Sequence, residues 1–205
     1  MHEAYRKNRE EGMKEEKTES GWNDYNNRFI RTYSGILGDK FHGPILDVGA
    51  GTDDFSKVCR EKGFEAEGID VDRCNFEQDP LPYTDASQQV VTLNAVIEHI
   101  RNPEILMKEI FRVLKPGGVV IMRTPNFQKD WKGFYNDPTH VKPYTPAGLS
   151  TTLKIYGFKV IFCEPGLICK SKLYWKLPKF IKWHVASWIR GGTKSIMVIG
   201  EKPIS

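Results

Sequence analysis

The sequence predicts an α/β fold in which strands alternate with helices to build a doubly wound, mostly parallel sheet with helices on both faces. Three observations predict it. An apolar run ends in a glycine-containing loop, I-L-D-V-G-A-G-T-D over residues 45–53. About twenty positions later a second strand-like run, residues 66–71, ends around Asp70. Strand-like and helix-like segments then keep alternating, an order typical of sheets that bind ligands at the carboxyl ends of their strands.

The first half of the chain supplies an amphipathic helix and four expected strands. Residues 22–37 carry aromatic and aliphatic side chains at three- and four-residue steps, which predicts a helix with one apolar face. We expect this helix to cover the ligand pocket. After it we expect a strand at 45–48, a helix at 54–62 ending at Gly63, a strand at 66–69, a short third strand near 74–76 and a strand at 90–94.

The second half continues the alternation. Residues 103–114 begin with Pro103, carry an apolar face and stop at Pro-Gly-Gly, which predicts a helix with clear ends. We expect a strand at 119–123, a helix starting at Tyr144 or Thr145, a strand at 158–163 after Gly157, and a last strand at 195–200.

Composition favours one globular domain behind a charged leader. The chain has 205 residues, of which 40% are hydrophobic, enough for a single core. Residues 1–20 alternate acids and bases, which indicates a solvated helix or a disordered leader, so we place the domain at 21–205. The chain has no apolar run of the roughly 18 residues that a membrane span needs and no secretory signal pattern, which predicts a cytoplasmic protein.

The glycine loop indicates the kind of ligand. Gly49 and Gly51 allow a ligand to approach the backbone closely, and Asp70 can accept both hydroxyls of a ribose. A dinucleotide fingerprint starting at Gly49 would need glycine at position 54, where the chain has Asp54, an anion in the place of a pyrophosphate. The loop therefore predicts an adenosine-containing cofactor other than NAD.

A longer series of motifs resembles a known family. Asp47 and the two glycines form D-x-G-x-G; L-P-Y, the pair Glu98-His99 and L-K-P-G-G at 114–118 follow in order. Across residues 45–164 this series resembles class I S-adenosylmethionine-dependent methyltransferases. The resemblance implies a Rossmann-like, seven-stranded sheet with an antiparallel edge hairpin, and S-adenosyl-L-methionine as cofactor.

The resemblance also implies roles for single residues. The acid of D-x-G-x-G organises the glycine loop near the cofactor's amino group, the glycines pass the methionine part, and the acid after the second strand binds the ribose unless it only caps the next turn. The implied cofactor-binding residues are Asp47, Gly49, Gly51, Asp70, Val71 at the adenine, Glu77 or else Asn75 at the adenine amino group, and Asn94 with Ala95 beneath the sulfonium.

Two positions depart from the family pattern. Asp53 replaces the third glycine, and Gln88-Gln89 replaces a Phe-Asp pair. Asp53 either caps the following helix, as Asp does well, or crowds the cofactor's carboxylate. In the second case cofactor affinity falls, and a catalytically silent cofactor-binding module in a complex becomes an alternative.

Two histidines are the candidate catalytic residues, because imidazole titrates near neutral pH. His140 lies in N-D-P-T-H-V-K-P, after the fifth expected strand, where family members contact the substrate. His99 is the second candidate, or else a helix-start histidine bonded to backbone. In the ubiquinone-biosynthesis type of O-methyltransferase the E-H pair belongs to a proposed metal cluster with an acid three residues earlier; the chain has Ala95 there, so we expect no metal.

A basic and aromatic insert precedes the last strand. Residues 165–200 contain no Asp or Glu, and seven cations alternate with aromatic side chains, all within 165–194. This composition suits an anionic membrane surface or a lipid-linked acceptor, an ordinary substrate cap, or nucleic acid. A net charge of +4 is too small to indicate nucleic acid by itself.

The course P-N, D-P-T-H-V and G-F after the fifth expected strand is similar to stand-alone methyltransferases of bacterial polysaccharide and cell-surface glycan pathways. The resemblance implies O-methylation of a small-molecule or glycan hydroxyl, with contact to the inner face of the membrane if the acceptor is lipid-linked. An RNA methyltransferase is a further alternative, but the chain lacks an N-P-P-Y-type motif and an appended RNA-binding domain.

Overall fold

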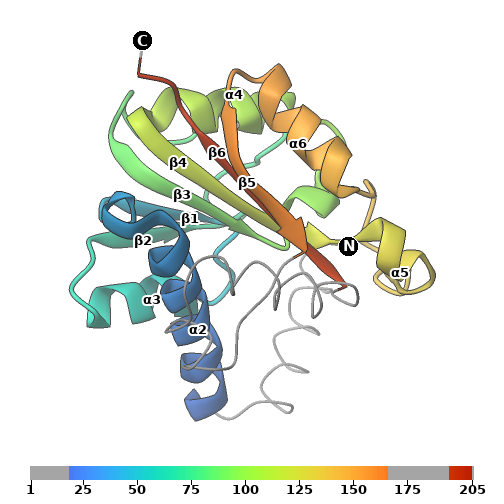
Figure 1. Ribbon diagram of the computed structural model, residues 1–205, viewed down its shortest axis with the longest axis horizontal. Coiled ribbons are helices and arrows are strands. Elements are labelled where there is room, and N and C mark those ends of the chain that lie inside the picture. The colour runs from blue at the N-terminus through green and yellow to red at the C-terminus, as the bar shows by residue number, and fades with distance from the viewer. Residues whose placement is uncertain (1–18, 166–193, 205) are drawn as a thin grey trace, which may run out of the picture.

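The computed structural model describes residues 19–165 and 194–204 (Figure 1). Within them a sheet of six strands has the order β2-β1-β3-β4-β6-β5. The strands are β1 (Ile45–Val48), β2 (Ala66–Ile69), β3 (Gln88–Asn94), β4 (Leu114–Pro125), β5 (Lys159–Pro165) and β6 (Ser195–Glu201). Most of the charged leader and almost all of the basic insert at 165–194 lie outside the described residues.

The pairing of the strands confirms a mostly parallel sheet with an antiparallel hairpin. β1 pairs in parallel with β2 and β3, and β3 pairs in parallel with β4. β6 runs antiparallel to both β4 and β5, which places β5 at the edge. The carboxyl ends of β1, β2, β3 and β4 therefore meet at one edge of the sheet, where a ligand site is expected.

The prediction of a third strand near 74–76 is wrong. The described part of the sheet has six strands where seven were expected. Cys74 and Phe76 are buried, as apolar residues of a strand would be. Their segment instead folds as turns: the amide of Cys74 donates to Asp70 O, and the amides of Gln78 and Asp79 donate to Asn75 O. Asn and Asp favour such local hydrogen bonds, which leave no ladder for a neighbouring strand.

Helices cover both faces of the sheet (Figure 1). One face carries α2 (Glu19–Leu37) and α3 (Asp54–Glu61), whose apolar side chains share a core with β1, β3, β4 and β6. The opposite face carries α4 (Glu104–Val113) and α6 (Pro146–Ile155) over a second core. The amphipathic helix expected at 22–37 is confirmed, with Phe29, Ile30 and Tyr33 buried.

Local signals explain several helix ends. Thr145 caps α6 by accepting from the amide of Gly148, and Pro146 occupies its first turn. The end of α4 passes directly into β4, and Lys202 Nζ donates to the carbonyls of Phe111 and Leu114 there. A short helix, α5 (Phe127–Phe134), was not expected; Asn126 caps it. Two 3-10 turns, η1 (Gly38–Lys40) and η2 (Ile97–His99), complete the elements.

In the part of the chain described here, no helix is long and apolar enough to cross a bilayer.

Candidate functional site

The glycine loop connects β1 to α3 at the carboxyl edge of the sheet. Gly49 has φ of 76°, and a Cβ there would lie 2.3 Å from Val96 Cγ2, so only glycine fits. Gly51 has φ of 57°, and a Cβ there would meet no heavy atom within 4 Å. The loop is therefore packed from behind at Gly49 and open at Gly51, which fits a ligand that passes close to the backbone.

Asp70 lies where β2 ends and ties that end to the glycine loop. Its Oδ2 accepts from the amide of Gly51 at 2.8 Å, and its Oδ1 accepts from the amide of Val71 at 2.7 Å. Each carboxylate oxygen has a second lone pair, so both can still accept from a ligand hydroxyl. Val71 is 49% exposed beside it. The pair of residues thus fits the predicted ribose and adenine contacts.

Asp47 is buried in β1 beneath the loop. Its Oδ1 accepts from Thr92 Oγ1 at 2.5 Å, and the Asn94 side chain also bonds to its carboxyl. Asn94 Oδ1 in turn accepts from Tyr33 of α2 at 2.8 Å, so α2 contacts the carboxyl end of β3. Burial raises the pKa of Asp47 to about 7 despite these hydrogen bonds.

The raised pKa of Asp47 predicts a pH dependence of stability. In the unfolded chain the carboxyl loses its proton near pH 4, so the folded state holds a proton that the unfolded state has lost between about pH 4 and 7. Stability from this group is complete below the unfolded pKa and falls as pH rises toward and through the folded value. From pH 5 to pH 8 we expect the wild type to lose about 2–3 kcal/mol relative to Asp47→Asn.

Urea unfolding at several pH values measures this difference. Asn keeps an acceptor for Thr92 but has no charge to bury, so the stability of the Asp47→Asn variant should not fall in this way between about pH 5 and pH 8. Asp39, exposed in η1, supplies the matched control: Asp39→Asn should follow the wild type. If the free energy of unfolding changed with pH in the same way in the wild type and in Asp47→Asn, Asp47 would not be the group that titrates.

Asp53, the residue in place of the third family glycine, adopts the left-handed conformation with φ of 61°. Its side chain makes no capping hydrogen bond, so the interpretation of Asp53 as a side-chain cap is wrong. Its Oδ2 pairs with Arg60 Nη2 at 2.7 Å, and its Oδ1 occupies the space beside Gly68. The side chain thus extends along α3 and β2.

Asp53→Gly is expected to leave cofactor affinity within about twofold and the melting temperature within a few degrees. Glycine relieves left-handed strain of about 1 kcal/mol, while the variant loses a half-exposed ion pair with Arg60 worth up to about 1 kcal/mol. Thermal melts and calorimetry with S-adenosylhomocysteine check both quantities. Clearly tighter binding by the variant would instead support crowding of the cofactor carboxylate.

In the loop after β2, hydrogen bonds within the protein engage both residues that were predicted to contact the adenine, Glu77 and Asn75. Glu77 Oε1 accepts from the amides of Arg101 and Asn102, which ties this loop to the turn before α4. Asn75 Oδ1 accepts from the amide of Glu77 at 3.1 Å. An adenine contact from Glu77 stays a prediction, and it would have to use the second carboxylate oxygen.

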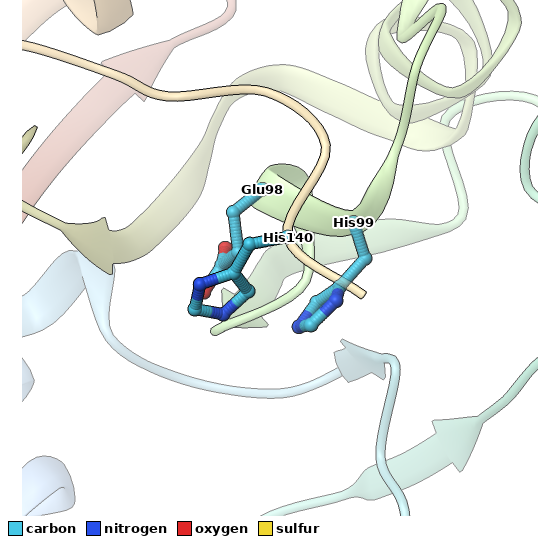
Figure 2. Close-up of side chains that lie close together, drawn as sticks. All are labelled: Glu98, His99 and His140. Carbon is cyan, nitrogen blue, oxygen red and sulfur yellow. The ribbon is translucent and has the colours of Figure 1, made fainter. Parts of the chain in front are cut away.

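The two candidate catalytic histidines lie side by side, although they are 41 positions apart in the sequence. His99 lies on η2, directly after β3, and His140 on the loop between α5 and α6 (Figure 2). Their ring centroids are 4.8 Å apart. The backbone carbonyl of Glu98 accepts from the amides of Val141 and Lys142, which holds the loop against η2.

Hydrogen bonds fix the orientation of both rings. His140 Nδ1 lies 2.6 Å from the carbonyl oxygen of Phe134, and His99 Nδ1 lies 3.2 Å from that of Thr139. A carbonyl only accepts, so each Nδ1 carries the proton in a neutral ring and each Nε2 has a lone pair. His140 Nε2 lies 3.7 Å from Asp137 Oδ2.

The neighbouring side chains complete the site. Glu98 is fully buried, and its Oε2 accepts from Thr124 Oγ1 at 2.9 Å. Thr139 Oγ1 donates to Asp137 Oδ1 at 2.6 Å and so accepts from His99 Nδ1 at 2.9 Å. Sequence reasoning missed these roles of Glu98, Asp137 and Thr139. The D-P-T-H string and the adjoining Glu of E-H were the available signals.

Fold and site together define a Rossmann-like α/β protein built to hold an adenosine-containing ligand at the carboxyl edge of its sheet. The model of the methyltransferase domain family matches residues 7–161, more than two thirds of the chain. The chain belongs to this family. The match confirms the sequence-based assignment to class I S-adenosylmethionine-dependent methyltransferases, an enzyme class whose cofactor is S-adenosyl-L-methionine.

Individual relatives agree with this assignment. A probable S-adenosylmethionine-dependent methyltransferase of Mycolicibacterium smegmatis is 37% identical over 94 residues, 45% of this chain and 36% of that protein. A ubiquinone biosynthesis O-methyltransferase of Idiomarina loihiensis is 26% identical over 142 residues, 58% of this chain and 57% of that protein. The chain therefore spans between about a third and just over half of these curated relatives.

A solved structure shows the same fold. The methyltransferase of Archaeoglobus fulgidus, described as dependent on S-adenosylmethionine, superposes with a TM-score of 0.61 at 20% identity. The match covers 88% of this chain and 94% of that one.

Proposed function

We propose that the protein transfers a methyl group from S-adenosyl-L-methionine to a hydroxyl of a small molecule, with a glycan as the favoured acceptor class. The single observation that carries the proposal is the pair His99 and His140, whose ring centroids lie 4.8 Å apart and whose Nδ1 atoms are both engaged with backbone carbonyls. An alcohol must lose its proton during O-methylation, and this pair is placed to receive it.

The residues of the chain have distinct tasks in this reaction. S-adenosylmethionine, when bound, supplies a methyl group on a sulfonium that an acceptor oxygen can displace. The loop at Gly51 and the Asp70 carboxylate hold the cofactor. His140 Nε2 accepts the hydroxyl proton, and the Asp137 carboxylate, 3.7 Å away, stabilises the imidazolium that results. Correct placement of the acceptor supplies much of the remaining acceleration.

Exposed aromatic side chains on and directly after α5 support a ring-shaped acceptor. Tyr135 is 61% exposed, and Trp131 on α5 is 60% exposed. The ring of Phe134 lies 5.0 Å from that of Tyr135 and 4.7 Å from that of His140, so the buried Phe134 connects the exposed Tyr135 to the imidazole. Large exposed apolar groups next to a polar site are typical of ligand contacts.

The basic insert at 165–194 supports a finer version of the proposal. Its lysines and aromatic residues suit a phosphate-bearing, lipid-linked acceptor and contact with the inner face of the membrane, in an otherwise cytoplasmic protein. This part rests on the sequence alone.

A labelled-methyl screen tests the proposal. Calorimetry first measures binding of S-adenosylmethionine and S-adenosylhomocysteine. Transfer is then measured with nucleotide sugars, lipid-linked glycans, quinol precursors and RNA. Label on an alkali-stable ether of a sugar or quinol supports the proposal. Binding without transfer to any acceptor would favour a silent cofactor-binding module, and label on RNA would favour an RNA methyltransferase.

A further inference from the structure

We infer that Glu98, His99 and His140 form a binding site for one divalent transition-metal cation. One ligand atom from each, a carboxylate oxygen and two imidazole nitrogens, lies within 4.8 Å of both others. Figure 2 shows the three side chains projecting into a common region, two from η2 and one from the facing loop. We expected no metal because Ala95 stands where the ubiquinone-type cluster has an acid; in the structure the distant His140 joins Glu98 and His99 instead.

The orientation of the rings is the one that metal binding requires. Both Nδ1 atoms donate to carbonyl oxygens, of Thr139 and of Phe134, so both Nε2 atoms present lone pairs. A histidine that binds a metal through one nitrogen commonly donates from the other to a carbonyl or carboxylate, which fixes the ring. Here the Asp137 carboxylate also orients Thr139 Oγ1, the second acceptor for His99 Nδ1.

The geometry needs only small adjustments. With metal–ligand bonds of about 2.0–2.2 Å and tetrahedral angles, two ligand atoms of one ion lie roughly 3.3–3.6 Å apart. Contraction from at most 4.8 Å requires side-chain movements below about 1 Å. The backbone already holds the two segments together, because Val141 N and Lys142 N donate to Glu98 O at 2.9 and 3.0 Å.

The ligand set selects the kind of cation. Two imidazoles and one carboxylate suit zinc, iron, cobalt or manganese, whereas magnesium and calcium prefer oxygen ligands. Three protein ligands leave coordination positions open, as in catalytic sites. The Glu98 carboxylate is fully buried, and a divalent cation beside it would offset the cost of burying its charge.

This cation deepens the proposed function, and its catalytic part rests on that function. A hydroxyl bound at an open position would release its proton to water at a lower pH than a free alcohol. The resulting alkoxide forms the new bond to the methyl carbon as the bond from carbon to sulfur breaks with its electron pair on sulfur. With the cation bound, the histidines hold it and the proton passes to water; without the cation, His140 Nε2 is the proton acceptor described above.

Metal binding is tested on the full chain without cofactor or acceptor, so its outcome is independent of the methyltransferase assay. Chelator-treated protein is dialysed against zinc, and bound metal is counted by elemental analysis. We expect one zinc per chain that depends on the site, affinity at least tenfold weaker in His99→Ala and His140→Ala, and binding in Thr139→Val reduced by a few-fold to tenfold. Magnesium under the same conditions should bind far more weakly.

Controls separate this site from adventitious binding. His42, exposed before β1, provides the matched variant, and His42→Ala should bind like the wild type. Glu98→Gln tests the buried ligand, and near-UV circular dichroism verifies that each variant is folded. Zinc should raise the melting temperature of the wild type and of His42→Ala, but not of His140→Ala. Absence of stoichiometric zinc, or zinc equally retained by the three ligand variants, would overturn the inference.

Discussion

Replacing His140 with Ala is expected to lower turnover by roughly two to four orders of magnitude while cofactor affinity stays within a few-fold. Nε2 of His140 acts on the acceptor either by taking its proton directly or by holding a bound cation. Ala removes that atom. The cofactor loop at Gly49 and Gly51 belongs to different elements, so its contacts persist. Single-turnover kinetics with labelled cofactor measure the change once the acceptor is known.

A second substitution separates chemistry from loop positioning. His140→Asn retains a side-chain donor that can reach the carbonyl of Phe134 in place of Nδ1, but it has no equivalent of Nε2. It should therefore keep the loop ordered and lose turnover as the alanine variant does. His42→Ala should behave as the wild type. Near-normal turnover of both His140 variants would move the catalytic role to His99 or abolish it.

Replacing Asp70 with Ala is expected to weaken binding of S-adenosylmethionine by about 1–3 kcal/mol, between five- and 150-fold. Two losses combine. The variant loses charge-assisted hydrogen bonds to the ribose hydroxyls, and the amide of Gly51 loses the acceptor that holds the glycine loop to the end of β2. Isothermal calorimetry with cofactor and with S-adenosylhomocysteine provides the measurement.

A conservative variant of Asp70 distinguishes the loss of the ribose hydrogen bonds from the loss of the contact with the amide of Gly51. Asp70→Asn keeps one oxygen that can accept from the amide of Gly51, but it removes the charge, so its affinity should lie between those of the wild type and Asp70→Ala. Asp39→Ala, exposed in η1, serves as the control. If Asp70→Ala bound the cofactor as the wild type does, the assignment of Asp70 to the ribose would be wrong.

Local chemistry explains why the sequence predicted so much of this fold. The helices at 22–37 and 103–114 and the strands at 45–48 and 90–94 carry the apolar periods and end signals that their environment requires, and all are present within a few residues. The predicted strand near 74–76 does not form, because Asn75 and Asp79 favour turns there. Its apolar residues are buried by tertiary packing instead.

At the site, the glycine loop and the acid after β2 follow from backbone requirements that a sequence displays directly. Gly49 has no room for a side chain, and Asp70 ends a strand beside the loop. Asp53 differs: the sequence shows only that it replaces a family glycine, while its positive φ and its pairing with Arg60 appear in the structure, where α3 lies over β2.

The sequence alone determined most of the order of elements, the cofactor class and the family, because each depends on residues close together in the chain. Only the tertiary structure brought His140 against His99 and Glu98 and buried Asp47 enough to raise its pKa to about 7. Those features depend on contacts between η2 and a loop some 40 residues away and on the depth of a strand within the sheet. Local sequence encodes neither quantity, because both arise when the sheet and its helices pack together.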